Sequence, residues 1–308
     1  MPLRREGMLI DWDRPELVCL VPAGGYGSRL GRLTEKHAKP SLPVAYDADG
    51  EITRMVDIPL EAIRMIGGKA VVTTFFAAHS LQFVSSYEHV TILRESGLST
   101  SADMLLNMRE DLQESGAETT GIIPGDARIS AAQISDLYEA HIKSKADATL
   151  LATHHTAGHN IRHVDQNGMM VDDGAAVGDS ADLGIHLINT EWLLDRLTAC
   201  SDRPEGVDIW DDVYDVGQPA GNILLHVPAD DKGWVDMGTP VAYFDTVTDL
   251  NSQHANRRAN IVFPGARLLN PDTTHTIALP NSSSELQHSF AILPEDTVVT
   301  SSDQTLQL

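Results

Sequence analysis

Cysteine, aromatic and basic residues are all scarce in this chain of 308 residues. The two cysteines are Cys19 and Cys200; Cys19 falls in a predicted strand, which argues against a disulfide scaffold and for a reducing compartment. Aromatic residues make up 5% of the chain and hydrophobic residues 42%, which indicates an ordinary aliphatic core. The chain has 22 Lys and Arg residues and 44 Asp and Glu residues, which gives a formal net charge of −22. Such a charge repels nucleic-acid backbones and anionic membranes, so neither is expected as a partner.

Long apolar runs are also missing. The N-terminal segment carries Glu6, Asp11 and Asp13 where a signal peptide needs apolar residues, and no stretch has the length of a membrane span. We therefore predict a cytoplasmic protein without a membrane partner. The length suits one sizeable domain and a small appendage.

Short apolar runs alternate with segments of helical spacing, which predicts an α/β fold with a mostly parallel sheet. The character changes near residue 251, where Asn, Ser, Thr and Pro become frequent and a short β-rich C-terminal extension, 251–308, is expected. The predicted strands are 17–21, 70–76, 121–123, 148–152 and 183–188, with short apolar runs at 260–263, 276–279 and 290–293 in the extension. The predicted helices are 59–66, 101–113, 130–145 and 190–198, the last with Thr190 as its cap.

A glycine-rich segment follows the first predicted strand directly: Ala23-Gly24-Gly25-Tyr26-Gly27-Ser28-Arg29, with Lys39 a short distance beyond. Glycines let backbone N–H groups approach a phosphate, and Arg29 and Lys39 can neutralise its charge. Open α/β sheets bind ligands at the carboxyl ends of their strands, where this loop is expected. The sequence thus predicts a site for a small anionic ligand.

Two common phosphate-binding fingerprints do not fit the segment. No lysine follows a glycine at the Walker spacing, and a dinucleotide pattern starting at Gly25 and Gly27 would need a third glycine where Leu30 stands. A nicotinamide-dependent oxidoreductase is therefore disfavoured. A tight glycine turn flanked by solvated basic residues stays open as the alternative without a ligand.

Two later segments join the glycine loop in one pattern. Ile122-Ile123-Pro124-Gly125-Asp126 ends an apolar run, and Gly233-Trp234-Val235-Asp236-Met237-Gly238-Thr239 holds a second carboxylate between glycines. With the glycine loop and Lys39-Pro40, they resemble the signature of sugar-1-phosphate nucleotidyltransferases. Weaker matches, such as 54–60 and 141–149, look most like glucose-1-phosphate adenylyltransferases (ADP-glucose pyrophosphorylases).

The resemblance implies a Rossmann-like nucleotidyltransferase domain over residues 1–250, with 251–308 as a shortened left-handed β-helix. It also implies the reaction, in which a nucleoside triphosphate and a sugar 1-phosphate yield a nucleotide sugar and pyrophosphate, a step of glycogen biosynthesis. A homo-oligomer is expected.

The resemblance assigns roles to individual residues in this sequence. Arg29 and Lys39 become the catalytic cations, and Asp126 and Asp236 the ligands of Mg²⁺, which takes hard oxygen ligands. Nucleotide binding falls to Ala23, Gly24, Gly25, Gly27, Ser28, Arg29 and Gly125, and substrate binding to Thr100 and Gly184.

Three departures from the family pattern leave a second function open. The family carries Glu-Lys-Pro, whose lysine contacts the sugar phosphate, where this chain reads Val171-Asp172-Asp173-Gly174-Ala175, and no Lys or Arg occurs between Arg162 and Arg196. The family's Leu-Gly-Thr-Ala reads Leu98-Ser99-Thr100-Ser101, and its Gly-Ile-Tyr reads Gly184-Ile185-His186. A non-catalytic paralogue that binds nucleotide or sugar phosphate is the alternative. The acidic residues Asp208, Asp211, Asp212 and Asp215 are interpreted as a solvated face.

Overall fold

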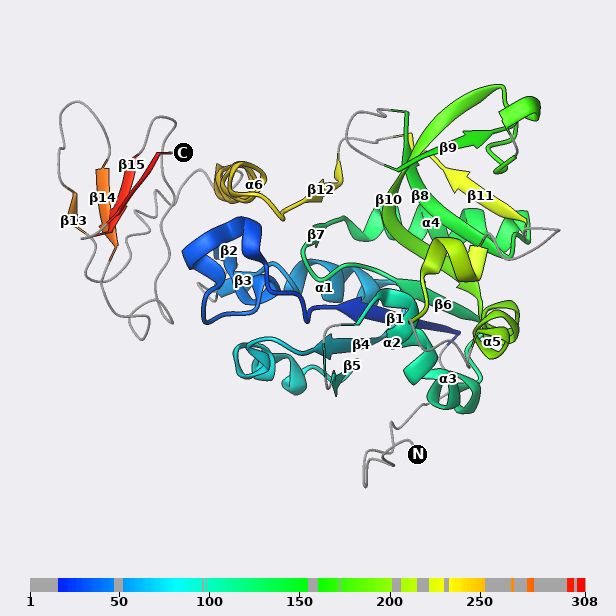
Figure 1. Cartoon of the computed structure of the whole chain (residues 1–308), viewed down its shortest axis with the longest axis horizontal. Helices are drawn as coiled ribbons and strands as arrows, with labels where there is room; N and C mark the ends of the chain where they lie inside the picture. Colours follow the sequence, from blue (N-terminus) through cyan, green and yellow to red (C-terminus); the bar gives the residue numbers. More distant parts are fainter. Residues whose placement is uncertain are drawn as a thin grey trace.

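The fold is seen in a computed structural model of the chain, and its elements can be followed in Figure 1. The structure describes residues 16–46, 52–95, 97, 99–154, 160–171, 173–200, 206–214, 222–229, 233–252, 267–268, 276–279, 298–301 and 304–307. Within these ranges, no helix combines the length and the apolar character needed to cross a bilayer.

An eight-stranded sheet forms the centre of the molecule, in the order β11-β8-β10-β6-β1-β4-β5 with β9 added beside β10. β1 pairs in parallel with β4 and β6, and β4 with β5, whereas β10 runs antiparallel to β6, β8 and β9. The predicted α/β class with a mostly parallel sheet is confirmed. The strands are β1 (Leu17–Pro22), β4 (Lys69–Thr74), β5 (Val90–Arg94), β6 (Thr119–Ile122), β8 (Ala148–Thr153), β9 (Asn160–Val164), β10 (Gly178–Asn189) and β11 (Ile223–His226).

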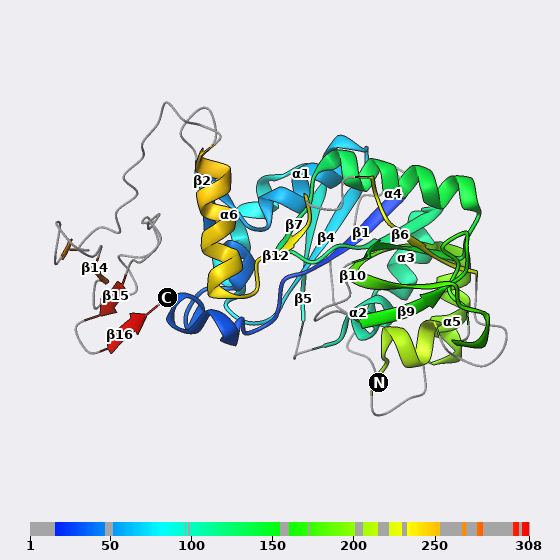
Figure 2. The ribbon, with the colours of Figure 1, turned by 90° about the horizontal axis from the view of Figure 1, so that it is seen from above.

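Helices cover both faces of this sheet, which explains why β1 is apolar throughout. Successive side chains of a strand point to opposite faces. Val18 and Leu20 accordingly pack with α2, α3 and α5, while Cys19 and Val21 pack with α1 and α4 on the other side. Figure 2 shows these two helical layers with the sheet between them. The helices are α1 (Asp57–Met65), α2 (Ser101–Asn107), α3 (Arg109–Ser115), α4 (Ala131–Ser144) and α5 (Thr190–Ala199).

Helix boundaries correct the predictions at two places. The predicted helix 101–113 is two helices, because the backbone departs from helical geometry at Met108 (φ −94°, ψ 3°). The predicted cap Thr190 is wrong: the side chain of Asn189 accepts a hydrogen bond from the backbone N–H of Trp192, and Thr190 is the first helical residue. Either residue type can cap a helix, so only the backbone conformation distinguishes them.

We expect Asn189→Ala to lower the free energy of unfolding by about 0.5–2 kcal/mol, because the Trp192 N–H loses its acceptor at the start of α5. The measurement is denaturant unfolding. Asn107→Ala, at an exposed position of α2, is the matched control and should change stability by less than about 0.5 kcal/mol. Equal effects of the two substitutions would contradict the capping role.

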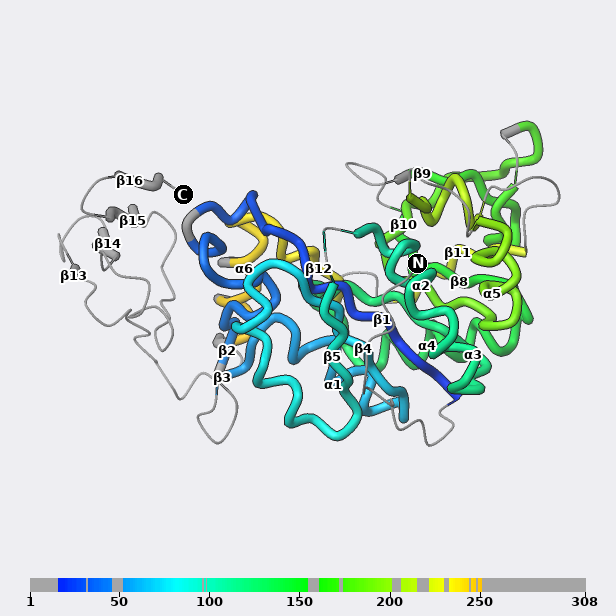
Figure 3. Tube along the Cα trace, turned by 60° about the horizontal axis from the view of Figure 1, so that its bottom comes forward, coloured from blue at the N-terminus to red at the C-terminus, as the bar shows by residue number. Residues whose placement is uncertain are grey.

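A third, smaller hydrophobic cluster joins the segment 30–58 to the segment 235–250. The hairpin of β2 (Pro43–Tyr46) and β3 (Ile52–Arg54) lies against α6 (Pro240–Ser252), as Figure 3 also shows. Val44 and Met55 pack with Tyr243 and Val247, and the Tyr243 hydroxyl donates to the carbonyl of Pro43 at 2.6 Å. Leu30, which follows the glycine loop, belongs to the same cluster. The cluster therefore places α6, the helix that follows Asp236, close to the glycine loop.

Four short strands of the C-terminal segment form a separate sheet, in which β14 pairs in parallel with β15 and antiparallel with β13. The predicted apolar run 276–279 is β14, while 260–263 and 290–293 lie outside the described residues. The division into 1–250 and 251–308, and the β-helical nature of the extension, stay predictions. The strands are β13 (Arg267–Leu268), β14 (Thr276–Leu279), β15 (Val298–Ser301) and β16 (Gln304–Gln307).

Candidate active site

The glycine loop leaves the carboxyl end of β1, between the neighbouring strands β4 and β6. Sequence order changes direction here, since β4 and β5 lie on one side of β1 and β6 on the other; such a point is where open α/β sheets bind ligands. The Ala23 N–H donates to the carbonyl of Thr73 and the Phe76 N–H to that of Gly24, so the loop is tied to the end of β4. The predicted place of the loop is therefore confirmed.

Gly27 fixes the course of this loop. Its φ is +61°, and a Cβ atom there would lie 2.9 Å from both the Cβ of Lys39 and the Cγ2 of Thr34. The Thr34 hydroxyl donates to the carbonyl of Gly27 at 2.8 Å, which fastens the loop from inside. Gly25 and Ser28, in contrast, are exposed. The loop thus packs directly on Lys39 and turns its other side to solvent.

Pairing of two short strands brings the predicted carboxylates together although they lie far apart in the sequence. β7 (Ala127–Arg128) pairs antiparallel with β12 (Val235–Asp236), so that Asp236 lies opposite Ala127. The Met237 N–H also donates to the carbonyl of Asp126 at 3.2 Å. Residues opposite each other in antiparallel strands have Cα atoms about 4.5–5.5 Å apart, so Asp126 and Asp236 lie on the same short stretch of paired backbone.

Each predicted carboxylate forms an ion pair with one predicted cation. Lys39 Nζ contacts Asp126 Oδ2, and both side chains are largely buried, with 15% and 14% of their surfaces exposed. Arg29 lies 3.6 Å from Asp236, and these side chains are 60% and 42% exposed. An exposed pair contributes little to stability, whereas a buried charge needs its partner. The Lys39–Asp126 pair is therefore the firmer of the two.

The donor set at this place fits Mg²⁺. The described part of the chain holds no cluster of three or more His, Cys, Asp or Glu side chains with metal-binding geometry. Mg²⁺ does not require one, since it commonly uses one or two carboxylates and completes its shell with substrate phosphates and water. Asp126 and Asp236 match that pattern. Their role as ligands stays a prediction.

The predicted substrate-binding residues Thr100 and Gly184 lie on other elements, at the start of α2 and within β10. Thr100 caps α2: its hydroxyl accepts from the Asp103 N–H and donates to the carbonyl of Val207 at 2.6 Å. Gly184 has φ +75°, a left-handed conformation that suits glycine. His186 pairs with Ile122 at the end of β6, and the two strands are antiparallel. Gly184, two residues before His186, therefore lies beside the segment that leads from β6 to Asp126. Contact of either residue with substrate stays a prediction.

A buried polar cluster on β10 was not predicted as part of the site. Asp182 and His186 are 6% and 4% exposed, and His186 Nε2 lies 3.1 Å from Asp182 Oδ1. The Tyr214 hydroxyl lies 3.0 Å from His186 Nδ1, and the Gly184 N–H donates to Asp182 at 2.8 Å. Burial opposes ionisation of Asp182, but His186, the Gly184 amide and Arg162 hold its pKa below the usual value. Two polar residues four positions apart, Asp182 and His186, within an otherwise apolar strand were the signal in the sequence.

The acidic segment that follows Val207 was interpreted as a solvated face, and this interpretation is wrong for Asp212. The 209–214 segment, η5 (Ile209–Tyr214), turns Asp212 inward, and only 6% of this residue is exposed. Its carboxylate accepts a hydrogen bond from the Asp208 N–H at 2.7 Å. Asp208 and Asp211 are exposed, and Asp215 lies outside the described residues.

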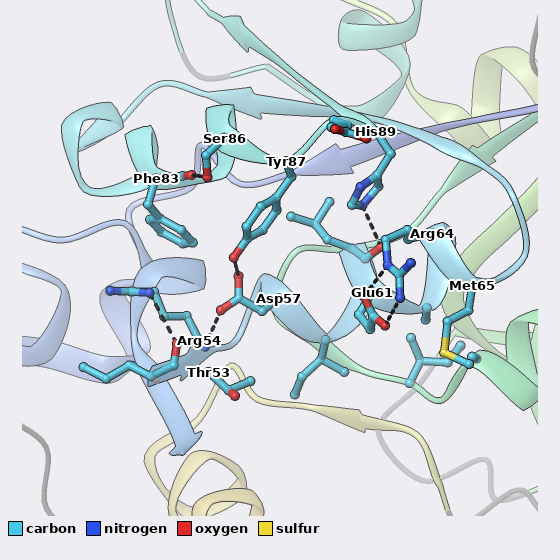
Figure 4. Close-up of a pocket in the computed structure, with 17 residues that line it drawn as sticks. Thr53, Arg54, Asp57, Glu61, Arg64, Met65, Phe83, Ser86, Tyr87 and His89 are labelled. Atoms are coloured by element: carbon cyan, nitrogen blue, oxygen red, sulfur yellow. Dashed lines mark hydrogen bonds and ion pairs between the residues drawn. The ribbon is translucent and has the colours of Figure 1, made fainter. Parts of the chain in front are cut away.

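A groove of about 980 Å³ lies elsewhere, beside α1 and the 3-10 segment η3 (Ala78–Ser86). Figure 4 shows Tyr87 donating to Asp57, whose other oxygen accepts from the Arg54 N–H. Burial raises the pKa of Asp57 and that of Tyr87, the latter to about 12. None of the predicted site residues lines this groove, so it is separate from the candidate active site.

Comparison with known proteins identifies the family. The profile described as nucleotidyl transferase matches residues 18–253, a range that includes the glycine loop, both aspartates and all of the central sheet except its first residue, Leu17. The chain belongs to the nucleotidyl transferase family. This membership confirms the predicted resemblance.

Curated relatives carry the name glucose-1-phosphate adenylyltransferase. The protein of Methylobacillus flagellatus is 26% identical over 278 residues, covering 76% of this chain and 63% of the relative. Those of Corynebacterium efficiens and a Thermotoga species are also 26% identical, over 78% and 85% of this chain and 68% and 66% of the relatives. This member of the family thus spans about two thirds of the length of these relatives.

Proposed function

We propose that this nucleotidyl transferase moves a nucleotidyl group from a nucleoside triphosphate to a sugar 1-phosphate, as a glucose-1-phosphate adenylyltransferase does by its name. The observation that carries the proposal is the gathering of two cations and two carboxylates beside the glycine loop, at the carboxyl edge of the sheet. The family and the names of the relatives support it.

The reaction in this proposal is an in-line displacement. An oxygen of the sugar 1-phosphate forms a bond to the α-phosphorus, the bond between that phosphorus and the bridging oxygen breaks, and pyrophosphate leaves with the electron pair. No side chain has to act as a nucleophile. Catalysis then depends on positioning the two phosphates and neutralising the charge that develops.

Residues of the loop and of the paired strands divide this work. The exposed Arg29 and the backbone of Gly25 and Ser28 hold the outer phosphates, while the largely buried Lys39 faces the α-phosphate. A charge that is shielded from water interacts more strongly with the phosphate than an exposed charge does. Lys39 is therefore the main electrostatic catalyst. Asp126 and Asp236 would hold Mg²⁺, which when bound neutralises charge on the phosphate oxygens.

Pyrophosphate release tests the proposal directly. The purified chain is incubated with each nucleoside triphosphate and each of several sugar 1-phosphates, with Mg²⁺ and with a chelator. We expect release with at least one combination, dependent on Mg²⁺. Calorimetric binding of Mg-nucleotide without release in any combination would favour the non-catalytic paralogue, which the missing lysine of the 171–173 segment suggests. Absence of both binding and release would contradict the proposed function altogether.

Asp236→Asn should weaken the binding of nucleotide in the presence of Mg²⁺ by at least about tenfold, because one metal-facing carboxylate charge is lost. Calorimetry with and without Mg²⁺ measures this effect. Asp245→Asn, an exposed residue of α6, is the matched control and should bind as the unchanged protein does. Equal affinity of Asp236→Asn and the parent chain would remove Asp236 from the metal site.

A further inference from the structure

Arg162 lies on the face of the sheet that carries the buried polar cluster. In the pairing of β9 with β10, Arg162 is opposite Ser180, and Asp182 follows two residues later on the same strand. Opposed residues of antiparallel strands share a face, and so do residues two apart in one strand. The side chains of Arg162 and Asp182 therefore extend to the same side of the sheet.

The guanidinium group of Arg162 is stacked on an aromatic ring. Its Cζ lies 3.5 Å from the ring centroid of Trp210, within η5. The chain just before η5 is fixed by α2, because Thr100 donates to the Val207 carbonyl and Asp103 accepts from the Val207 N–H. A guanidinium stacked in this way keeps its donors in the plane of the group, where they can bind two oxygens of a phosphate.

One donor of Arg162 lacks an acceptor. Its Nε is buried and has no hydrogen-bond partner among the residues that the structure describes. The nearby Asp182 accepts from the Gly184 N–H, and its two oxygens lie 3.1 and 3.3 Å from His186 Nε2. A buried donor that finds no acceptor is costly, so an acceptor from a ligand would relieve this cost.

No other fixed positive charge lies on this part of the sheet. Across the four strands β8, β9, β10 and β11, and across η5, Arg162 is the only Lys or Arg. Arg196, the next arginine along the chain, belongs to α5 and stacks on Trp192 of the same helix, at 5.2 Å. A doubly charged sugar phosphate beside Asp182 needs a cation to offset the repulsion.

We infer that Arg162 is the residue that binds the phosphate of the sugar 1-phosphate in this chain, a specificity role that rests on the proposed function. Trp210 orients its guanidinium, and the charge of Asp182 attracts the cation from the same face. The lysine that is missing at 171–173 is thereby replaced from the neighbouring strand β9.

Binding measurements on the full chain test this inference separately from turnover. Glucose 1-phosphate and other sugar 1-phosphates are titrated by calorimetry into the parent chain, Arg162→Gln, Arg162→Lys and Arg196→Gln. We expect Arg162→Gln to weaken sugar-phosphate binding about ten- to a hundredfold. The affinity of Arg162→Lys for the sugar phosphate should lie between those of the parent and Arg162→Gln, since lysine keeps the charge but lacks the planar guanidinium. Arg196→Gln, the other tryptophan-stacked arginine, should bind as the parent does, and Mg-nucleotide affinity should be unchanged in all four proteins.

Kinetics then separate a binding role from a general loss of structure. Arg162→Gln should raise the KM for the sugar phosphate and leave the KM for the nucleotide unchanged, with a thermal unfolding midpoint close to that of Arg196→Gln. Sugar-phosphate affinity of Arg162→Gln equal to that of the parent would overturn the inference while leaving the proposed function intact. Sugar-phosphate binding that depends on Arg162 without any pyrophosphate release would support the inference and contradict the enzyme. A parent chain that binds no sugar phosphate would overturn both.

Discussion

Lys39→Ala is expected to lower kcat about 10²–10³-fold, the loss seen when one preorganised donor at a transition state is removed, while the affinity for Mg-nucleotide changes little. The reason is the position of the cation. Lys39 is largely buried between the glycine loop and Asp126, so its charge acts where water is mostly excluded. The negative charge around the α-phosphate is largest in the transition state. Loss of the Lys39 cation therefore lowers turnover more than it weakens nucleotide binding.

The same substitution leaves Asp126 without its partner, and this has to be measured alongside. Removing one member of a buried ion pair destabilises a protein because the remaining charge stays desolvated. Thermal unfolding with and without Mg-nucleotide therefore accompanies the kinetics, and rates are compared below the unfolding transition. Lys36→Ala, three residues earlier and exposed, is the control and should keep kcat within about twofold. An unchanged kcat with a raised KM for the nucleotide would make Lys39 a binding residue.

Gly27→Ala should lower kcat about a hundredfold, because a misplacement of catalytic groups by about 1 Å is enough for such a loss. The added methyl would lie 2.9 Å from the Cβ of Lys39, closer than non-bonded carbons approach, and the same distance from Thr34. Lys39 or the loop has to move. The φ of +61° also strains alanine, and a loss of stability of about 1–3 kcal/mol is expected in addition.

Gly31→Ala separates backbone strain from displacement of Lys39. Gly31 also has a positive φ, +54°, but a Cβ atom there would meet nothing within 4 Å. Its stability loss should be of the same order as that of Gly27→Ala, whereas its kcat should stay near that of the parent. A comparable fall of kcat in both variants would mean that loop strain, and not the position of Lys39, limits turnover.

Periodicity and local chemistry made several elements predictable from the sequence. The fully apolar run of β1 and the glycines directly after it marked both a buried strand and the loop at its end. The apolar run 276–279 likewise coincides with β14. Helix boundaries were less predictable: the break at Met108 and the cap at Asn189 depend on the backbone conformation of single residues, which neighbouring residue types leave open.

The sequence by itself determined the α/β class, the family and the place of the glycine loop after the first strand, because each of these depends on motifs and periodicities within short segments of the chain. Tertiary structure alone decided which distant residues meet. Strand pairing brings Asp236 to Asp126, and the antiparallel course of β10 sets Arg162 on the face of Asp182 and Trp210. Such contacts arise from register between strands and from burial of a shared face, which no local pattern encodes.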